Sequence, residues 1–319
     1  GLTYGETYTY RVRAYTQINH SGYSNEKSAE TTFPAPTNLM ATAIDDQTIR
    51  LTWTDNCTFE TGYRIERKTG SGSFVQIAEV ATNTISYEES GLTEYIDYTY
   101  RVRAFTFLNQ SAYSNEKAVS IPGTVTDIDG NIYKTIKIGT QIWMAENLKV
   151  THYRNGDAIP NVTDDTQWGD LTTEAYCNYD NDANNATTYG RLYNWYAVSD
   201  SRNIAPTGWH VPSDAEWQTL VDYLGGDAVA GGKMKEAGTM HWNSPNTGAT
   251  NESGFSALPG GYRSIIGQYN YVGYVGFWLS ATEYSSSSAW YRHLSYYYSD
   301  VGRYGNYKQD GFSVRCVRD

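Results

Sequence analysis

The sequence has few cysteines, few histidines and no long apolar run, and each shortage excludes a class of protein. Its three cysteines, Cys57, Cys177 and Cys316, cannot all pair within one chain, and they are too scattered for a thiolate zinc site. Its five histidines show no spacing typical of a metal site. No apolar stretch reaches the roughly 18 residues of a membrane-spanning helix, so no membrane insertion by this segment is expected.

Basic residues are also scarce relative to acidic ones. The 24 Lys and Arg residues face 35 Asp and Glu residues, which gives a formal net charge of -11. Such a chain repels phosphate backbones, and no basic patch stands out in the sequence, so nucleic acid is not an expected partner. Residues 1–4 have neither the basic nor the apolar region of a signal peptide, and we expect a fragment or a mature segment.

Tyrosine is what the chain has in abundance. Its 30 Tyr and nine Trp residues, together with much Gly, Asn, Ser and Thr, are typical of short strands and polar loops in extracellular or cell-surface proteins. The 319 residues exceed a usual single core of about 100–200 residues, so two or three domains are expected.

A segment near the start of the chain recurs 90 residues later. Tyr8–Lys27 reads YTYRVRAYTQINHSGYSNEK, and Tyr98–Lys117 reads YTYRVRAFTFLNQSAYSNEK. A repeat of this length with alternating residues fits tandem β-sandwich domains, because solenoid units run about 20–50 residues. Residues 49–54 and 62–67 are predicted as strands of opposing sheets, with Trp53 facing the core.

The second copy of the repeat is predicted to be a core strand. Tyr100, Val102 and Ala104 should face the core, which leaves Arg101 and Arg103 on the solvent face.

These residues carry a first resemblance. The front of the chain resembles fibronectin type III domains through Pro34–Leu39 (PAPTNL), Trp53, Gly91–Leu92 and Tyr98–Ala104 (YTYRVRA). The resemblance implies the C-terminal part of one such domain over 1–33 and a whole domain over 34–121. It also implies a tyrosine corner at Tyr98, whose hydroxyl bonds to backbone near the end of the preceding strand. A spacer or stalk is the expected role, with Cys57 a free thiol.

The remaining residues predict a compact α+β domain rich in loops. Asp129–Gly130 supplies the tight turn of a β-hairpin. A capping box, Ser213–Glu216, predicts a helix that ends at Gly225–Gly226, and 189–198 is a second helix candidate. Segments 183–188 and 241–256 are expected to be long loops.

A second resemblance rests on motifs in this part of the chain. They are Ile142–Leu148 (IWMAENL), Tyr189–Tyr196 (YGRLYNWY), Pro206–Ser213 (PTGWHVPS), Asp214–Trp217 (DAEW), Gly254–Arg263 (GFSALPGGYR), Phe277–Glu283 (FWLSATE) and Gly311–Arg318 (GFSVRCVR).

Together these motifs make residues 122–319 similar to the Fibrobacter succinogenes major paralogous domain. The resemblance implies the C-type-lectin-like fold that formylglycine-generating enzymes also use, in exported or surface proteins. The fold class we expect is therefore multidomain, with all-β fibronectin type III sandwiches followed by an α+β C-type-lectin-like domain.

Catalysis and bound metals find little support in the residues. Copper chemistry of the formylglycine-generating type needs two reactive cysteines in one site, whereas Cys316 alternates with Phe312 and Val314 like a buried strand residue. We therefore expect no enzyme. Cys177 and Cys316 form either a disulfide or two buried free thiols. No cofactor is expected, and the one alternative is calcium at Asp180 and Asp182, in a loop rich in oxygen ligands.

The run Tyr291–Asp310 predicts a recognition loop. Its Tyr, Ser, Gly, Asn, Asp and Arg residues are those that binding surfaces favour, and it lies between the strand region 277–283 and an apolar terminal strand. The alternative is an aromatic-rich loop that covers the core. The candidate ligand-binding residues are Tyr291, His293, Tyr296, Tyr297, Tyr298, Asp300, Arg303, Tyr304, Asn306 and Tyr307.

The composition of this run is also similar to that of C-type-lectin-like variable proteins diversified by retroelements. From Tyr296 to Asp310, only Lys308 and Gln309 cannot be reached from an Asn codon by changing adenines. The resulting hypothesis is a non-catalytic surface or secreted protein that recognises a protein or glycan ligand on another cell or particle. The alternatives are a glycan adhesin and a structural or adhesive module that packs against copies of itself or its stalk.

Overall fold

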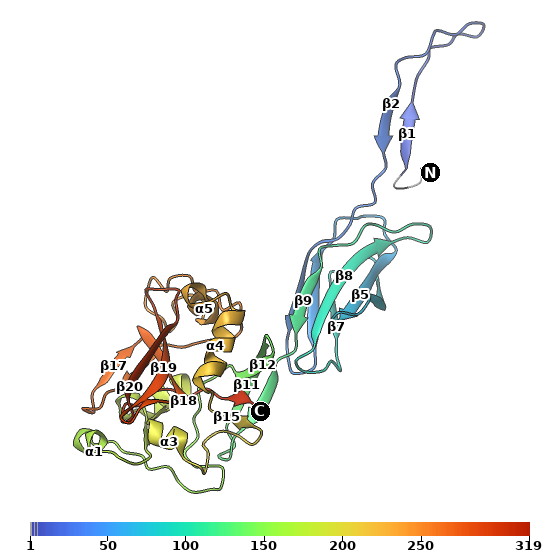
Figure 1. Cartoon of the computed structure of the whole chain (residues 1–319). Helices are drawn as coiled ribbons and strands as arrows, with labels where there is room; N and C mark the ends of the chain where they lie inside the picture. Colours follow the sequence, from blue (N-terminus) through green and yellow to red (C-terminus); the bar gives the residue numbers. More distant parts are fainter. Residues whose placement is uncertain (1, 3, 5) are drawn as a thin grey trace. The chain divides into compact units, whose positions relative to one another are not determined.

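The computed structural model describes residues 2, 4 and 6–319 in two compact units, 1–121 and 122–319 (Figure 1). Residues 1, 3 and 5, which belong to the first predicted domain, lie outside the described residues. The strands of the first unit are β1 (Thr7–Tyr10), β2 (Lys27–Glu30), β3 (Thr37–Ala43), β4 (Ile49–Thr54), β5 (Gly62–Thr69), β6 (Val75–Ala81), β7 (Ser86–Glu89), β8 (Asp97–Phe105) and β9 (Lys117–Ser120).

The second copy of the repeat lies in a β-sandwich. A three-stranded sheet of order β3-β4-β7 faces a four-stranded sheet of order β6-β5-β8-β9, so the two predicted strands do belong to opposing sheets. Trp53 from one sheet and Tyr100, Val102 and Ala104 from the other are buried in one core, as predicted. The all-β sandwich is thereby confirmed.

The tyrosine corner is also present. The Tyr98 hydroxyl accepts a hydrogen bond of 2.9 Å from the backbone N–H of Thr93, and the ring is buried beside Leu92. On the outer face, Arg101 and Arg103 both pair with the carboxylate of Glu66, at 2.7 and 3.2 Å. The crossover that leads into β8 is therefore fixed by a buried ring and a backbone hydrogen bond.

The second unit is built mostly from strands. They are β10 (Gly123–Thr126), β11 (Ile132–Ile138), β12 (Gln141–Met144), β13 (Tyr176–Cys177), β14 (Leu192–Tyr193), β15 (Trp209–His210), β16 (Gly260–Arg263), β17 (Tyr269–Val272), β18 (Val275–Ser285), β19 (Ser288–Ser295), β20 (Gly302–Tyr307) and β21 (Val317–Arg318). The helices are short: α1 (Asp165–Gly169), η1 (Tyr179–Asn181), α2 (Ala183–Tyr189), α3 (Trp195–Ser199), α4 (Asp214–Tyr223) and α5 (Asp227–Met234). The expected α+β lectin-like class is therefore not confirmed.

Local sequence signals predicted some of these helices and strands correctly and others wrongly. The hairpin β10–β11 and the capping box of α4 are as predicted, and Gly225 and Gly226 follow that helix with positive φ. The predicted helix over 189–198 and the predicted loop over 183–188 are both wrong. The chain forms α2, β14 and α3 there because Gly190, at φ 79°, ends one helix and the Asn194 side chain caps the next.

Two five-stranded sheets organise the second unit, in the orders β10-β11-β12-β21-β15 and β17-β16-β18-β19-β20. The second of these, which we call the β18 sheet, carries most of the terminal run (Figure 1). Its two faces pack against different apolar cores. Phe277 and Leu279 join the core around Tyr193 and Cys316, whereas Trp278 joins the core around Trp217.

A buried arginine connects these two cores. Arg315 donates hydrogen bonds to the Asn147 side chain at 2.8 Å and to the carbonyls of Phe255 and Ser256, and its guanidinium lies 4.1 Å from the Phe255 ring. The indole N–H of Trp278 donates to the same Asn147 oxygen at 2.9 Å. Burial lowers the pKa of Arg315 to about 9.

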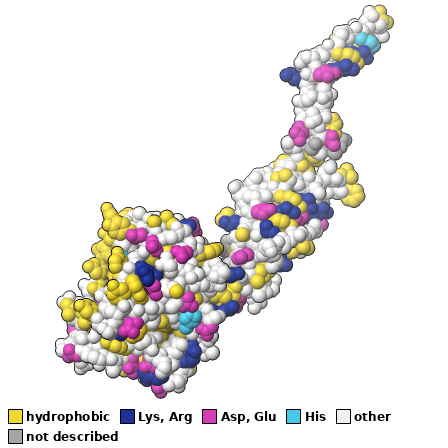
Figure 2. All heavy atoms as spheres, in the orientation of Figure 1, with side chains coloured by type: hydrophobic (Ala, Val, Ile, Leu, Met, Phe, Trp, Pro, Cys, Tyr) yellow, Lys and Arg dark blue, Asp and Glu magenta, His cyan; other side chains and the backbone are white. Residues whose placement is uncertain are grey.

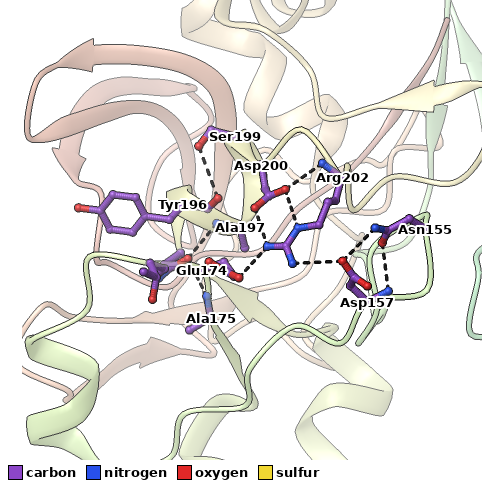
Figure 3. A network of polar contacts seen from close by, with 11 residues as sticks. Asn155, Asp157, Glu174, Ala175, Tyr196, Ala197, Ser199, Asp200 and Arg202 are labelled. Atoms are coloured by element: carbon purple, nitrogen blue, oxygen red, sulfur yellow. Dashed lines mark hydrogen bonds and ion pairs between the residues drawn. The ribbon is translucent and has the colours of Figure 1, made fainter.

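Another arginine holds the loops that cover α3. Arg202 reaches Asp200 at 2.7 Å, Glu174 at 2.6 Å and Asp157 at 3.5 Å (Figure 3). In Figure 3 the Tyr196 ring points away from this network. These carboxylates are committed to the fold, so the network offers no free acidic group.

The terminal run is not a loop, and that prediction is wrong. Residues 288–295 and 302–307 pair as the antiparallel hairpin β19–β20, which places Tyr291 opposite Tyr304 and His293 opposite Gly302. The pairing needs a glycine there, because a Cβ at position 302 would lie 2.1 Å from the His293 ring. Residues 311–317 are buried throughout, and only Val317–Arg318 is a named strand.

Tyr98→Phe should lower the free energy of unfolding of the first unit by about 1–3 kcal/mol, because the N–H of Thr93 loses its acceptor. Urea unfolding of the full chain measures the change. Tyr10→Phe, at an exposed tyrosine of the same unit, is the matched control and should have no effect. Equal free energies of unfolding for the two variants would contradict the proposed role of the tyrosine corner.

Gly302→Ala should destabilise the second unit by about 1–3 kcal/mol, because the new methyl group overlaps the His293 ring. The double variant with His293→Ala should recover much of the loss, since removal of the ring makes room. Thermal unfolding of both variants is the measurement. A single variant as stable as the natural chain would show that the overlap is relieved without strain.

Candidate ligand-binding surface

One face of the β18 sheet carries a continuous row of aromatic side chains. We call it the aromatic face. Its ring contacts connect Tyr262, Tyr271, Phe277, Tyr291, His293, Tyr304 and Phe312.

The strand alternation of β19 and β20 creates this row. Tyr291 and His293 point to one side of β19, and Tyr304 lies opposite Tyr291 on β20. The ring centroids of Tyr291 and Tyr304 are 6.3 Å apart, and the His293 and Tyr304 rings stack at 5.5 Å. The sheet therefore assembles three of the predicted site residues on one rigid surface.

The aromatic face is open at its edges and buried at its centre. Tyr271 and Tyr304 are 55% and 57% exposed, whereas Phe277 and Phe312 are buried beneath them. Hydrophobic side chains gather on the part of the unit where β17, β19 and β20 lie (Figure 2). The Nδ1 atom of His293 is buried without a hydrogen-bond partner among the described atoms, and burial lowers the pKa of this histidine.

A second group of tyrosines lies at the turn between β19 and β20. Tyr296 packs edge-on against Tyr274 at 5.2 Å, and Tyr297 contacts both Tyr296 and Tyr298. Tyr297 and Tyr298 are exposed, as the binding hypothesis requires. These predicted site residues thus form a cluster at one end of the sheet.

A buried lysine fixes that turn through its backbone. The Lys235 ammonium donates to the carbonyl oxygens of Thr247, Ser295 and Tyr298 at 2.7–2.9 Å. Burial lowers the pKa of Lys235 to about 8, while the charge of Asp300 opposes the shift. The turn is held in place without using its tyrosine side chains.

Other predicted site residues face the opposite side of the sheet. Arg303 pairs with Asp214 at 2.6 Å and lies 3.8 Å from the Trp290 ring, and Tyr307 alternates to the same side. Arg292 completes the cluster by binding the same carboxylate at 2.6 Å. These arginines hold the pKa of Asp214 below its usual range, against the opposing effect of burial. Arg303 is therefore engaged within the fold.

The remaining predicted residues take separate positions. Asp300 is exposed in the turn, and Asn306 lies opposite Ala289 on the side of Tyr304. Sequence reasoning missed Tyr262 and Tyr271, which lie on neighbouring strands. The tyrosine-rich stretch 269–274 (YNYVGY) is the signal that could have drawn attention to β17.

Asp310 is a further residue that sequence reasoning missed. It is only 2% exposed, and burial raises its pKa to about 7, partly offset by a hydrogen bond from the backbone N–H of Ile265. Its charge in turn contributes to the raised pKa values of Tyr262 and Tyr291. A buried carboxyl group therefore lies close enough to Tyr262 and Tyr291 to act on them electrostatically.

The calcium candidates belong to η1 and the cap of α2 and are not part of the aromatic face. Asp180 is exposed at φ 52°, and the Asp182 carboxylate caps α2 by accepting from the N–H of Asn184 at 2.8 Å. Among the described residues, no group of three or more His, Cys, Asp or Glu side chains could hold a metal ion. Calcium at this position stays a prediction.

The disulfide considered for Cys177 and Cys316 is absent, and the alternative of two buried thiols holds. Both thiols are free, because the two residues lie in different cores. Burial raises the pKa of Cys177 to about 11 and that of Cys316 still further. Neither thiol has the low pKa of a reactive cysteine. Cys57 is also free, as expected, and it is buried.

Comparisons with solved structures concern the first unit. The chicken CNTN1 FN1–FN3 domains are 16% identical over 37% of this chain and 44% of that chain, with a TM-score of 0.26, so the match spans less than half of that protein. A Fn3-like protein from Clostridium thermocellum is 27% identical over 28% and 94%, with a TM-score of 0.25. A two-domain fibronectin type III segment of chicken tenascin is 16% identical over 38% and 67%, with a TM-score of 0.30.

Family comparisons cover both units. Residues 34–119 match the fibronectin type III domain, and residues 136–318 match the Fibrobacter succinogenes major domain. None of the curated proteins matches the chain. Within the described residues, no helix is long and apolar enough to cross a membrane. Because its longer match spans more than half of the sequence, the chain belongs to the Fibrobacter succinogenes major domain family, with a fibronectin type III domain ahead of it.

Proposed function

We propose that this chain is a non-catalytic recognition protein that binds a protein ligand on the aromatic face. The observation that carries the proposal is the arrangement of Tyr271, Tyr291 and Tyr304 as partly exposed rings on one continuous sheet face. The two matched families favour a surface or adhesive module, which agrees with an extracellular setting.

These rings would bury apolar surface and gain hydrogen bonds when a partner binds. A tyrosine buries a large area with only two side-chain torsions to fix, and its hydroxyl can still bond at the rim. Exposed rings clustered on one face are unfavourable in water and useful in an interface. Phe277 and Phe312 support the rings from below, so little conformational entropy is lost on binding.

The proposal includes a C-type-lectin-like fold for the second unit and diversification of its terminal run. The motifs shared with the Fibrobacter succinogenes major domain support the fold, and the composition of the terminal run supports diversification. Tyr297 and Tyr298 in the turn, and Tyr304 on β20, are where such variation would alter the surface. A template repeat in the coding DNA that differs only at adenines is the observation that tests diversification.

A glycan is the second candidate ligand. The open rings of Tyr271 and Tyr304 would stack on the apolar face of a sugar. Binding to a glycan array separates this candidate from protein recognition. Self-association of the purified chain separates both from a structural module that packs against its own copies.

The double variant Tyr271→Ser and Tyr304→Ser should weaken binding to a ligand about tenfold or more, because the two exposed rings of the aromatic face are lost from the interface. A panel of purified surface proteins supplies the ligands, and affinities are measured by surface plasmon resonance. The melting temperature should change little, since both side chains are largely exposed.

The matched control is Tyr223→Ser, because this tyrosine is 65% exposed on α4 and lies outside the aromatic face. It should leave affinity unchanged. Loss of stability in the double variant with unaltered binding would instead assign the rings to packing.

A further inference from the structure

Asp310 is a buried carboxylate of the second unit without a charged partner, whereas several other buried charges of this unit are paired. Arg263 pairs with Asp165, Arg292 with Asp214, and Lys308 with Glu283, all at 2.6–2.8 Å. No ion pair to Asp310 occurs among the described residues. A buried carboxylate without a cation is energetically costly, so its retention here requires a reason.

Asp127 is a comparable carboxylate in the same unit. That carboxylate is also buried and unpaired by a cation, but it accepts hydrogen bonds from two backbone N–H groups, the Asn131 amide and the Tyr133 hydroxyl. For Asp310 the N–H of Ile265 is the donor that the described residues supply, and burial raises the pKa of the carboxyl group to about 7.

Asp310 acts on the aromatic face from below. Its negative charge contributes to the raised pKa values of Tyr262 and Tyr291, and it directly precedes the segment that puts Phe312 against Tyr291 at 5.0 Å. A carboxylate under rings adds to the negative potential that the ring faces already present.

The cations near this face are committed elsewhere. Arg292 and Arg303 bind Asp214 on the opposite side of the sheet. The Lys308 ammonium is held by Glu283 and by the carbonyl of Ser286. Burial lowers the pKa of His293, so this ring is neutral at physiological pH. These four described groups therefore do not compensate the charge of Asp310, which adds to the negative potential of the ring faces.

We propose that the aromatic face receives an arginine side chain of a protein partner, which stacks on the rings of Tyr291 and Tyr304 while Asp310 supplies the complementary charge. The inference rests on the proposed function and names the chemistry of its ligand. A guanidinium suits the site because it is planar, stacks on aromatic rings and is more weakly hydrated than an ammonium.

The test uses the full chain with ¹³C-labelled tyrosine and two small probes, Nα-acetyl-arginine methylamide and its neutral analogue Nα-acetyl-citrulline methylamide. Titrations followed by tyrosine ring shifts at pH 8 should give roughly fivefold tighter binding of the arginine probe. Asp310→Asn should reduce the arginine affinity to that of citrulline. Equal affinities of the two probes for the natural chain would overturn the proposal without any variant.

The matched control is Asp222→Asn, which removes one negative charge from an exposed position on α4. It should preserve the preference for arginine. Loss of the preference in this control as well would mean that net charge, and not Asp310, attracts the probe. If Tyr271→Ser with Tyr304→Ser abolishes binding of protein ligands while the natural chain ignores arginine, the proposed function stands and this inference fails.

The folding of Asp310→Asn is checked by its melting temperature. The folded carboxyl group has a pKa of about 7 against an ordinary value of 3.8, so the folded state holds a proton between these values. Its stabilising contribution is complete below about pH 4 and is lost as the pH rises through about 7. Tyr262 on β16 and Tyr291 on β19, the ionisable groups that face it, stay protonated in this range because their pKa values are raised. The variant should melt above the natural chain at pH 8 and close to it at pH 4.

Discussion

The second unit depends on one buried positive charge. Burial of a guanidinium costs several kcal/mol unless its donors are satisfied, and Arg315 meets that condition with a side-chain oxygen and with backbone carbonyls from separate segments. Asn147 also accepts from Trp278 and donates to the carbonyl of Tyr189. The observed arrangement of the terminal segment, β18 and the loop at Phe255 pairs the buried donors of Arg315 and Trp278.

That arrangement gives the β18 sheet two faces with different tasks. One face is filled by Trp278, Leu294 and the helices, and its arginines are neutralised by Asp214. The other face is only partly covered, so Tyr271 and Tyr304 remain open above a packed base. A sheet fixed from behind can present aromatic rings without relying on the same rings for stability, which is the separation that a binding surface needs.

The sequence predicted local features and the core of the sandwich well, but it did not show which copy of the repeat is buried. The capping box at Ser213 and the tyrosine corner at Tyr98 each depend on residues close in the chain, and both are present. The two copies of the repeat show that burial cannot be predicted from the local sequence alone. Tyr10 and Tyr100 occupy the same place in identical stretches, yet Tyr10 is 51% exposed and Tyr100 is fully buried, because burial depends on the strands that pair with each copy.

The candidate site could not be fully predicted for a related reason, because it depends on contacts between different strands. The composition of 291–310 indicated a surface but not a hairpin, because the pairing with β18 that orders it is not visible in the run itself. The division of Arg303 from Tyr304 follows from strand alternation once the hairpin is known. Tyr262 and Tyr271 could not be joined to the site from sequence, since neither the pairing of β16 with β18 nor the contact of Tyr262 with Phe312 is visible in the stretch itself.

Lys235 has a consequence for how this surface can change over evolutionary time. Its ammonium binds carbonyl oxygens of residues 247, 295 and 298, which every amino acid provides. The hydrogen bonds of Lys235 therefore do not depend on which side chains the turn carries. Substitutions at Tyr297 or Tyr298 leave these hydrogen bonds intact. The side chains at the turn can therefore change, and with them the binding specificity, while the backbone of the turn stays in place.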